Sequence, residues 1–279
     1  MFTFFSSGFN KFWALLTAIL LTVTINAENP PGVPDGAVLV TSHTYMLDQA
    51  LTRGQGVTTD GQYFYFSGNL FLNKTDMQTN KTLVKNVMAI PPQLLLLGDN
   101  HIGGISYYNK TIYAAIEDSK VWKYPIVALF DSATLKFTGR YSILSAELQK
   151  NGVPWIAVDG ENGYLYSAQR DNSPALIVYD LQTLTFVKTV PLSMTVDKIQ
   201  GAEMYKGILY AATNDATQAV YAINPVTGEA HKYFDRNLVS GSEGEGMTVL
   251  ETADGAVFHT LDLSPIFINA YFRHYAPVK

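Results

Sequence analysis

The sequence predicts an all-β protein, a single five-bladed β-propeller, and three observations lead to this fold. Segments of four short strands recur along the 279 residues of the chain. Their period of about 40–50 residues is the size of one propeller blade. One type of turn recurs at the same place in these segments, and their second strands share an aromatic residue that is mostly followed by small ones. A six-bladed ring with one degenerate blade is the alternative.

The recurring turn joins the third and fourth strands of four repeats and opens with Asp or Asn. A side chain of this kind hydrogen-bonds the backbone two residues further on, which is why the position selects these residues. The turns run from Asp76 to Thr79, from Asp131 to Thr134, from Asp180 to Thr183 and from Asn224 to Thr227.

The strands are predicted from short runs rich in β-branched and aromatic residues between turn residues. The clearest repeat, residues 101–139, has strands at 101–108, 111–118 and 125–130 and a fourth after its turn. The other repeats place strands at 56–61, 62–68, 70–76 and 83–90; at 154–163, 164–171, 175–180 and 185–190; at 199–207, 208–215, 219–224 and 229–234; and at 244–255, 256–263 and 267–275.

The last repeat has only three predicted strands before the chain ends. Residues 37–47 alternate like a strand but have no partner beside them in the sequence. We expect them to supply the missing fourth strand, which would close the ring and remove its exposed edges. The propeller domain is therefore predicted over residues 37–279.

The N-terminal region is predicted to be a signal peptide followed by an extended linker. Residues 1–27 contain one charge, Lys11, before an apolar run at 12–25, and cleavage is expected after Ala27. The apolar run is shorter than the roughly 20 residues that a membrane span needs. Residues 28–36 contain three prolines. Secretion agrees with three N-glycosylation sequons, at Asn73, Asn80 and Asn109.

The composition excludes several classes of function. The chain is 47% hydrophobic with a formal net charge of −5, so it lacks the basic footprint of a nucleic-acid-binding protein. It has no cysteine, which excludes disulfides, thiol catalysis and cysteine zinc sites. The sequence contains no phosphate-binding glycine loop, and its serines and histidines form no hydrolase triad pattern.

A functional site is predicted where the inner strands begin and the second strands end, because these positions meet at one mouth of a propeller channel. Carboxylates from four repeats would face one another there, and they repel unless a cation, Arg170 or protonation neutralises them. Ca²⁺, which takes six to eight oxygen ligands, is the predicted cofactor. The predicted ligand-binding residues are Asn100, Glu117, Trp155, Arg170, Asn214, Glu245 and Asp262, and the predicted metal ligands are Glu117, Glu203 and Glu245.

His101 and Glu203 are the candidate catalytic residues. His101 opens an inner strand, and the two glycines that follow it allow a ligand close to the backbone. The structural alternative is a histidine bonded to a neighbouring carbonyl, and the strand-ending residues Asp118, Asp171 and Asp215 are more typical of turns than of ligand sites. His259 is interpreted as a packed residue, and no role is assigned to His43, His231 and His274.

Three functions remain open. The first is a secreted, monomeric glycoprotein that binds a small polar ligand or divalent cation at the channel mouth. The second is an enzyme, a metal-assisted hydrolase, lactonase or cyclotransferase, in which His101 or Glu203 acts as general base. The third is a lectin-like interaction scaffold that binds a glycan or another partner through its outer rims. We expect no nucleic-acid partner and no membrane attachment after signal cleavage.

The repeats resemble secreted β-propellers, and two segments resemble particular families. Residues 53–61 and 200–203 are similar to inner-strand motifs of the glutaminyl cyclotransferases of plants and bacteria, and this resemblance implies a role for Glu203 alone. Residues 100–104 and 154–156 depart from that family's pattern. Glu245 and Gly246 resemble a motif of the calcium-dependent lactonase and gluconolactonase propellers, which have six blades.

Overall fold

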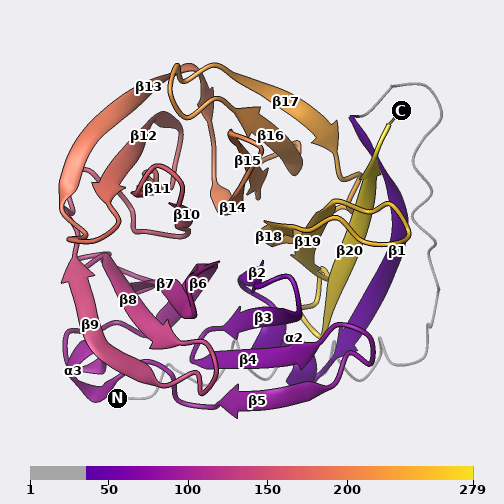
Figure 1. The fold of residues 1–279 in the computed structure, drawn as a ribbon, viewed down its shortest axis with the longest axis horizontal. Coiled ribbons are helices and arrows are strands. Elements are labelled where there is room, and N and C mark those ends of the chain that lie inside the picture. Colours follow the sequence, from indigo (N-terminus) through magenta and orange to yellow (C-terminus); the bar gives the residue numbers. More distant parts are fainter. Residues whose placement is uncertain (1–35, 279) are drawn as a thin grey trace, which may run out of the picture.

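The computed structural model describes residues 36–278, which form a ring of five four-stranded antiparallel sheets around a central axis (Figure 1). The predicted five-bladed propeller is confirmed, and the six-bladed alternative is wrong. The predicted signal peptide and all but the last residue of the predicted linker lie outside the described residues.

Each blade runs from an inner strand at the axis to an outer strand at the rim. Blade 1 comprises β2 (Val57–Thr59), β3 (Tyr63–Gly68), β4 (Phe71–Asp76) and β5 (Thr82–Asn86). Blade 2 comprises β6 (His101–Tyr108), β7 (Thr111–Glu117), β8 (Ile126–Asp131) and β9 (Phe137–Ile143). Blade 3 comprises β10 (Ala157–Asp159), β11 (Tyr164–Ser167), β12 (Ser173–Asp180) and β13 (Phe186–Val196). Blade 4 comprises β14 (Ile199–Tyr205), β15 (Ile208–Thr213), β16 (Ala219–Ile223) and β17 (Ala230–Asp235).

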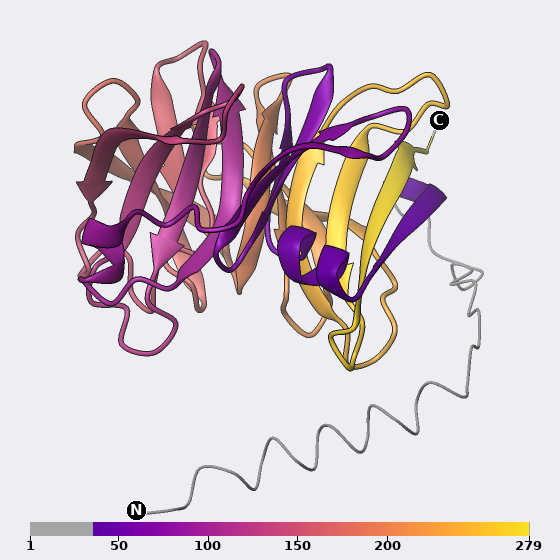
Figure 2. The ribbon, with the colours of Figure 1, turned by 90° about the horizontal axis from the view of Figure 1, so that it is seen from below.

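Blade 5 combines the two ends of the described chain. Its strands are β18 (Glu243–Val249), β19 (Phe258–Leu263), β20 (Asn269–Pro277) and, at the rim, β1 (Ala37–Met46). β1 pairs with β20 in antiparallel register from Ala37 opposite Pro277 to Met46 opposite Asn269, and the two strands lie side by side in Figures 1 and 2. The predicted closure of the ring by an N-terminal strand is therefore confirmed.

The recurring Asp and Asn turns form at the predicted places, and in all four the side chain also reaches one residue further than expected. The Oδ1 atoms of Asp76, Asp131 and Asp180 accept the backbone N–H three residues later at 2.8, 2.8 and 2.6 Å. Asn224 does the same at 3.1 Å. These bonds replace the backbone pairing that is lost at the turn, so the turn fixes the register of the third and fourth strands.

The prediction missed two short helices and misplaced several strand ends. α2 (Asp48–Arg53) joins β1 to β2, and α3 (Pro92–Leu95) joins blade 1 to blade 2. Each is too short to show helical periodicity in the sequence. The strand predicted at 83–90 ends at Asn86, and the inner strand predicted at 154–163 is reduced to β10.

The inner strands approach one another so closely that glycine is required at equivalent positions in four blades. We call Gly56, Gly104, Gly201 and Gly246 the glycine ring. A Cβ on Gly201 would lie 2.5 Å from the Cα of Gly246, and a Cβ on Gly246 would lie 2.7 Å from the Cα of Gly56. The N–H of Gly246 also donates to the carbonyl of Gln55 at 2.8 Å. The backbone itself therefore narrows the channel at this level.

Apolar side chains fill the spaces between blades. At the seam between blades 5 and 1, Tyr45 of β1 is buried, with its ring 5.7 Å from Phe66 and 6.5 Å from Phe272. The guanidinium of Arg53 lies 4.5 Å from the centre of the Tyr45 ring, and the Tyr45 hydroxyl donates to Oδ1 of Asn80 at 2.8 Å. Tyr45 thus anchors β1 to the neighbouring blade.

We expect Tyr45→Ala to lower the free energy of unfolding by about 4 kcal/mol, because it removes a buried ring and opens the seam. Denaturant unfolding measures this change. The matched control is Tyr141→Ala on the outer strand β9, where 39% of the side chain is exposed and the expected change is under about 1 kcal/mol. An equal effect of the two substitutions would contradict the anchoring role of Tyr45.

Candidate binding site at the channel mouth

The structure brings five of the predicted site residues to one mouth of the channel, together with Gln55 and Glu243. His101 is the first residue of β6 and lies opposite Glu117, the last residue of β7. Glu245 lies on the inner strand β18. Arg170 follows β11, and Asn214 follows β15. The convergence has a simple cause: inner strands begin, and second strands end, on the same face of the ring.

Gln55 connects three blades at this mouth. Its Oε1 lies 2.6 Å from Nε2 of His101, and its Nε2 donates to Oε1 of Glu245 at 3.3 Å and to the carbonyl of Gly54 at 3.2 Å. The two hydrogen bonds that the Gln55 NH₂ group donates fix the orientation of the Gln55 side chain. Its oxygen therefore accepts, and Nε2 of His101 carries the hydrogen.

Two hydrogen-bond acceptors face each other without a donor between them. With the hydrogen on Nε2, the neutral His101 ring has a lone pair on Nδ1, and this buried atom has no partner. Oε1 of Glu117 lies 3.8 Å from Nδ1, which is too long for a direct hydrogen bond. The other oxygen of Glu117 accepts the N–H of Val153 at 2.5 Å. A ligand that carries N–H or O–H groups would satisfy both acceptors.

Burial shifts the protonation of these groups toward their neutral forms. Burial and the charge of Arg170 lower the pKa of His101 to about 4. Burial raises the pKa of Glu117 to about 7, against the opposing effects of the Val153 N–H and Arg170. Burial and the nearby Glu243 carboxylate also raise the pKa of Glu245 well above its usual range. Near neutral pH the His101 imidazole is therefore neutral, and the Glu117 carboxyl group is present in both its protonated and its ionised form.

Arg170, Asn214 and Asn100 lie around these acceptors. The Arg170 guanidinium lies 5.5 Å from the centre of the Trp122 ring. Burial raises the pKa of Glu243, and the charge of Arg170 opposes this rise. Asn214 accepts the N–H of Gly244 at 3.0 Å and donates to Glu243 at 3.4 Å. Asn100 is exposed, and its Oδ1 accepts the N–H of Ser119 at 3.3 Å. Asn214 is thus a support for Glu243. Asn100 is an exposed residue beside His101, and its backbone N–H donates to the carbonyl of Glu117 at 3.1 Å.

Sequence reasoning missed Asp99. This residue is buried, and neither oxygen of its carboxyl group has a hydrogen-bond partner. Burial and the charge of Asp118 raise its pKa to about 7, and Asp99 in turn raises the pKa of Glu117. Nothing in the sequence separates Asp99 from an ordinary turn residue, because its burial depends on the packing of blades 1 and 2.

Glu203 lies deeper in the channel than His101, so the two predicted catalytic residues are not brought together. Its carboxyl group accepts hydroxyl hydrogens from Thr58 at 3.1 Å, Ser106 at 3.4 Å and Thr248 at 3.3 Å, each from a different blade. Thr248 follows Glu245 by three residues, which along a strand corresponds to about 10 Å. Burial raises the pKa of Glu203 to about 7, and the three hydroxyls oppose this shift.

Two predicted ligand-binding residues lie away from the mouth. Trp155 is completely buried in an apolar cluster between blades 3 and 4. Asp262 is completely buried too, and it forms an ion pair with Arg273 at 2.6 Å. The first is a core residue and the second belongs to a structural ion pair.

The predicted calcium ligands do not form a common site. Glu203 lies below the glycine ring, apart from Glu117 and Glu245. Within residues 36–278, no group of three His, Asp or Glu side chains could hold a metal ion. The three predicted carboxylate ligands therefore do not surround one point, and a Ca²⁺ site at the mouth stays a prediction.

The three sequons differ in accessibility. Asn73 is buried and donates to the carbonyl of Thr52 at 2.5 Å, so the folded protein has no room for a glycan there. Asn80 is half-buried and accepts from Tyr45 and Arg53. Asn109 is exposed in the β6–β7 turn, on the face opposite the mouth. Of the three asparagines, Asn109 alone is exposed.

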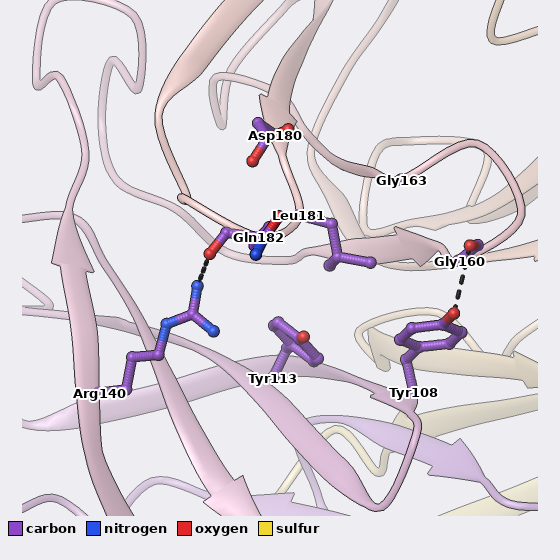
Figure 3. A pocket seen from close by; sticks show the side chains of 8 residues that line it. All are labelled: Tyr108, Tyr113, Arg140, Gly160, Gly163, Asp180, Leu181 and Gln182. Carbon is purple, nitrogen blue, oxygen red and sulfur yellow. Dashed lines mark hydrogen bonds between the residues drawn. The ribbon is translucent and has the colours of Figure 1, made fainter.

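A cleft of about 360 Å³ lies between blades 2 and 3 on that opposite face (Figure 3). The Tyr108 hydroxyl donates to the carbonyl of Gly160 at 3.3 Å, and the Arg140 guanidinium donates to the carbonyl of Gln182. The polar groups of these two blade 2 side chains are thus hydrogen-bonded to blade 3, and the bonds hold the two blades together across the cleft.

Fold and site define a five-bladed propeller with an acidic, acceptor-rich mouth. The family described as a repeat of unknown function (DUF6923) matches residues 105–258, more than half of the chain, and the protein belongs to this family. No curated protein matches the sequence. Among residues 36–278, no helix is long and apolar enough to cross a membrane.

The solved structures that are similar to the chain include the following two. Hydrazine synthase of Kuenenia stuttgartiensis has a TM-score of 0.46 and 13% identity over 78% of this chain and 57% of its own. A chain of the mitotic checkpoint complex has a TM-score of 0.47 and 9% identity over 92% of this chain and 98% of its own. The protein thus spans little more than half the length of the hydrazine synthase chain.

We expect Glu117 and Glu203 to lower stability as the pH rises from about 5 to about 8, because both bind protons more tightly in the folded than in the unfolded state. Below a pH of about 6.5 the lowered pKa values of His101 and His274 act in the opposite direction, so comparison with Glu203→Gln isolates the carboxyl contribution. Each group should contribute on the order of 1–2 kcal/mol to this loss. Denaturant unfolding across the pH range measures it. Glu203→Gln should flatten the profile, whereas Glu229→Gln, an exposed turn residue, should leave it unchanged.

Proposed function

We propose that the protein is a binding module whose channel mouth takes a small polar ligand with hydrogen-bond donors, preferably a compact amine. The observation that carries this proposal is the facing pair of acceptors, Nδ1 of His101 and Oε1 of Glu117, which lie 3.8 Å apart with no donor between them. An ammonium group has three donors and a charge that complements the carboxylates of the mouth.

The arrangement favours binding over catalysis. A general base must lie within hydrogen-bond reach of the proton that it removes, and an activated reaction needs a second group nearby. His101 is bonded to Gln55, and Glu203 lies deeper in the channel, held by three hydroxyls. We therefore place the enzyme and scaffold alternatives after a ligand-binding function.

Calorimetric titration with ethanolamine tests the proposal. At a pH of about 8, where Glu117 is ionised, we expect binding that weakens about ten-fold at a pH of about 5.5. Glu117→Gln should cause a similar loss at the higher pH, and Glu229→Gln should not. Glycerol, which has donors but no charge, should bind more weakly. The proposal would be contradicted if ethanolamine did not bind, or if its binding changed neither with pH nor with Glu117→Gln. Tight binding of calcium chloride in place of ethanolamine would identify a cation site.

We also propose that the protein is exported and glycosylated. The supporting observations are the apolar run followed by Ala27 in the sequence and the exposure of Asn109. In a secretory eukaryotic host we expect Asn109→Gln to remove one glycan from the secreted protein, whereas Asn73→Gln should remove none. Mass spectrometry of the secreted chain measures both changes. A glycan on Asn73 would contradict its burial in the folded state.

A further inference from the structure

A second cleft, of about 390 Å³, lies at the seam where blade 5 meets blade 1. It is distinct from the channel mouth, because the loop that forms one of its walls, residues 250–257, leaves β18 at the end opposite Glu243. Its other walls come from β1, β20, β3 and the turn after β4. The lining residues are Thr41, His43, Phe64, Met77, Gln78, Asn80, Thr252, Ala253, Asp254, Phe272 and His274.

Two of the five histidines of the protein, His43 and His274, line this cleft, and a third, His259, is buried behind them in contact with His274. Nδ1 of His259 lies 2.6 Å from Nδ1 of His274, and the ring of His43 lies 5.3 Å from that of His274. Nε2 of His259 lies 2.8 Å from the carbonyl oxygen of Leu250. The three histidines come from neighbouring strands of blade 5: β19, β20 and β1.

The hydrogen bonds determine where each hydrogen lies. A carbonyl oxygen can only accept, so Nε2 of His259 carries a hydrogen and its Nδ1 accepts. Nδ1 of His274 must then donate, which leaves a lone pair on Nε2 of His274. This atom is buried and has no hydrogen-bond partner, and the His274 residue is only 7% exposed to solvent. Burial and the neighbouring His259 and His43 lower the pKa of His274 to about 3, so it stays a neutral acceptor.

The remaining walls supply one charge and an apolar surface. Oδ1 of Asp254 accepts the Thr252 hydroxyl at 2.6 Å and the Ala256 N–H at 3.2 Å, and these bonds lower its pKa. The carboxylate is therefore ionised at the exposed rim of the cleft. The rings of Phe64 and Phe272 form the inner wall, 4.9 Å apart and perpendicular to each other. None of the described lining residues is Lys or Arg.

We propose that this cleft binds a cationic amine carried on an apolar body. The ammonium group donates a hydrogen to Nε2 of His274 and lies near the carboxylate of Asp254, while the apolar body packs on Phe64 and Phe272. Rotation of the exposed His43 side chain admits the ligand. The site is complete only when β1 has paired with β20, because both strands line it.

Calorimetric titration with two probes that share an indole ring tests the charge preference. We expect tryptamine to bind at least about ten-fold more tightly than indole-3-acetate, since the latter places a carboxylate against Asp254. Asp254→Asn should weaken tryptamine binding about three-fold. The matched control is Asp131→Asn, the turn aspartate of blade 2, which should have no effect. Absence of tryptamine binding, or equal binding of the two probes, would overturn the proposal.

The role of His274 is tested separately. His274→Phe should weaken tryptamine binding about five-fold, the loss of one hydrogen bond. Since this change also leaves His259 without its donor, the ¹⁵N spectrum of the histidines in the unmutated protein is the second measurement. Nε2 of His274 should appear as an unprotonated nitrogen that shifts on addition of tryptamine. A protonated Nε2, or one that tryptamine does not move, would overturn the assignment.

The two binding sites can be told apart. Glu117→Gln at the channel mouth should leave tryptamine binding unchanged, and Asp254→Asn should leave ethanolamine binding unchanged. A parallel loss of tryptamine binding in Glu117→Gln would place the tryptamine site at the mouth and overturn the inference.

Discussion

The close approach of the inner strands at the glycine ring is the constraint on which the arrangement of the channel depends. Gly201 and Gly246 have no room for a Cβ, and the N–H of Gly246 bonds directly to the carbonyl of Gln55. Side chains before the glycines in each strand therefore belong to the mouth, and side chains after them lie deeper. This division separates Glu245 and His101 from Glu203, even though all three are polar residues of inner strands.

A shortage of hydrogen-bond donors is common to both candidate sites. At the mouth, Nδ1 of His101 faces Glu117; at the seam, Nε2 of His274 has no partner and Asp254 supplies a negative charge. In each place burial favours the neutral imidazole, so the histidine acts as an acceptor and not as a cation. Unpaired buried acceptors are costly, which is the physical reason to expect a donor-bearing ligand at each site.

β1 serves two purposes in this molecule. It supplies the fourth strand of blade 5, and so removes the open edge that β20 would otherwise present. It also carries Tyr45 into the seam with blade 1 and His43 to the cleft beside His274. Closure of the ring and formation of the seam cleft therefore depend on the same strand pairing.

The repeats, the five blades, the Asp and Asn turns and the closure of the ring by the strand predicted at residues 37–47 could be predicted from the sequence, because these features depend on local residue patterns and on the count of strands. The sequence also placed His101 and Glu117 at the same mouth, because the start of an inner strand and the end of the second strand of a blade lie at the same face of the ring. The sequence did not predict that Trp155 and Asp262 are internal, that Glu203 lies apart from His101, or that His43, His259 and His274 come together. Burial, rotamer and tautomer depend on contacts between blades, and these contacts leave no regular signal along the chain.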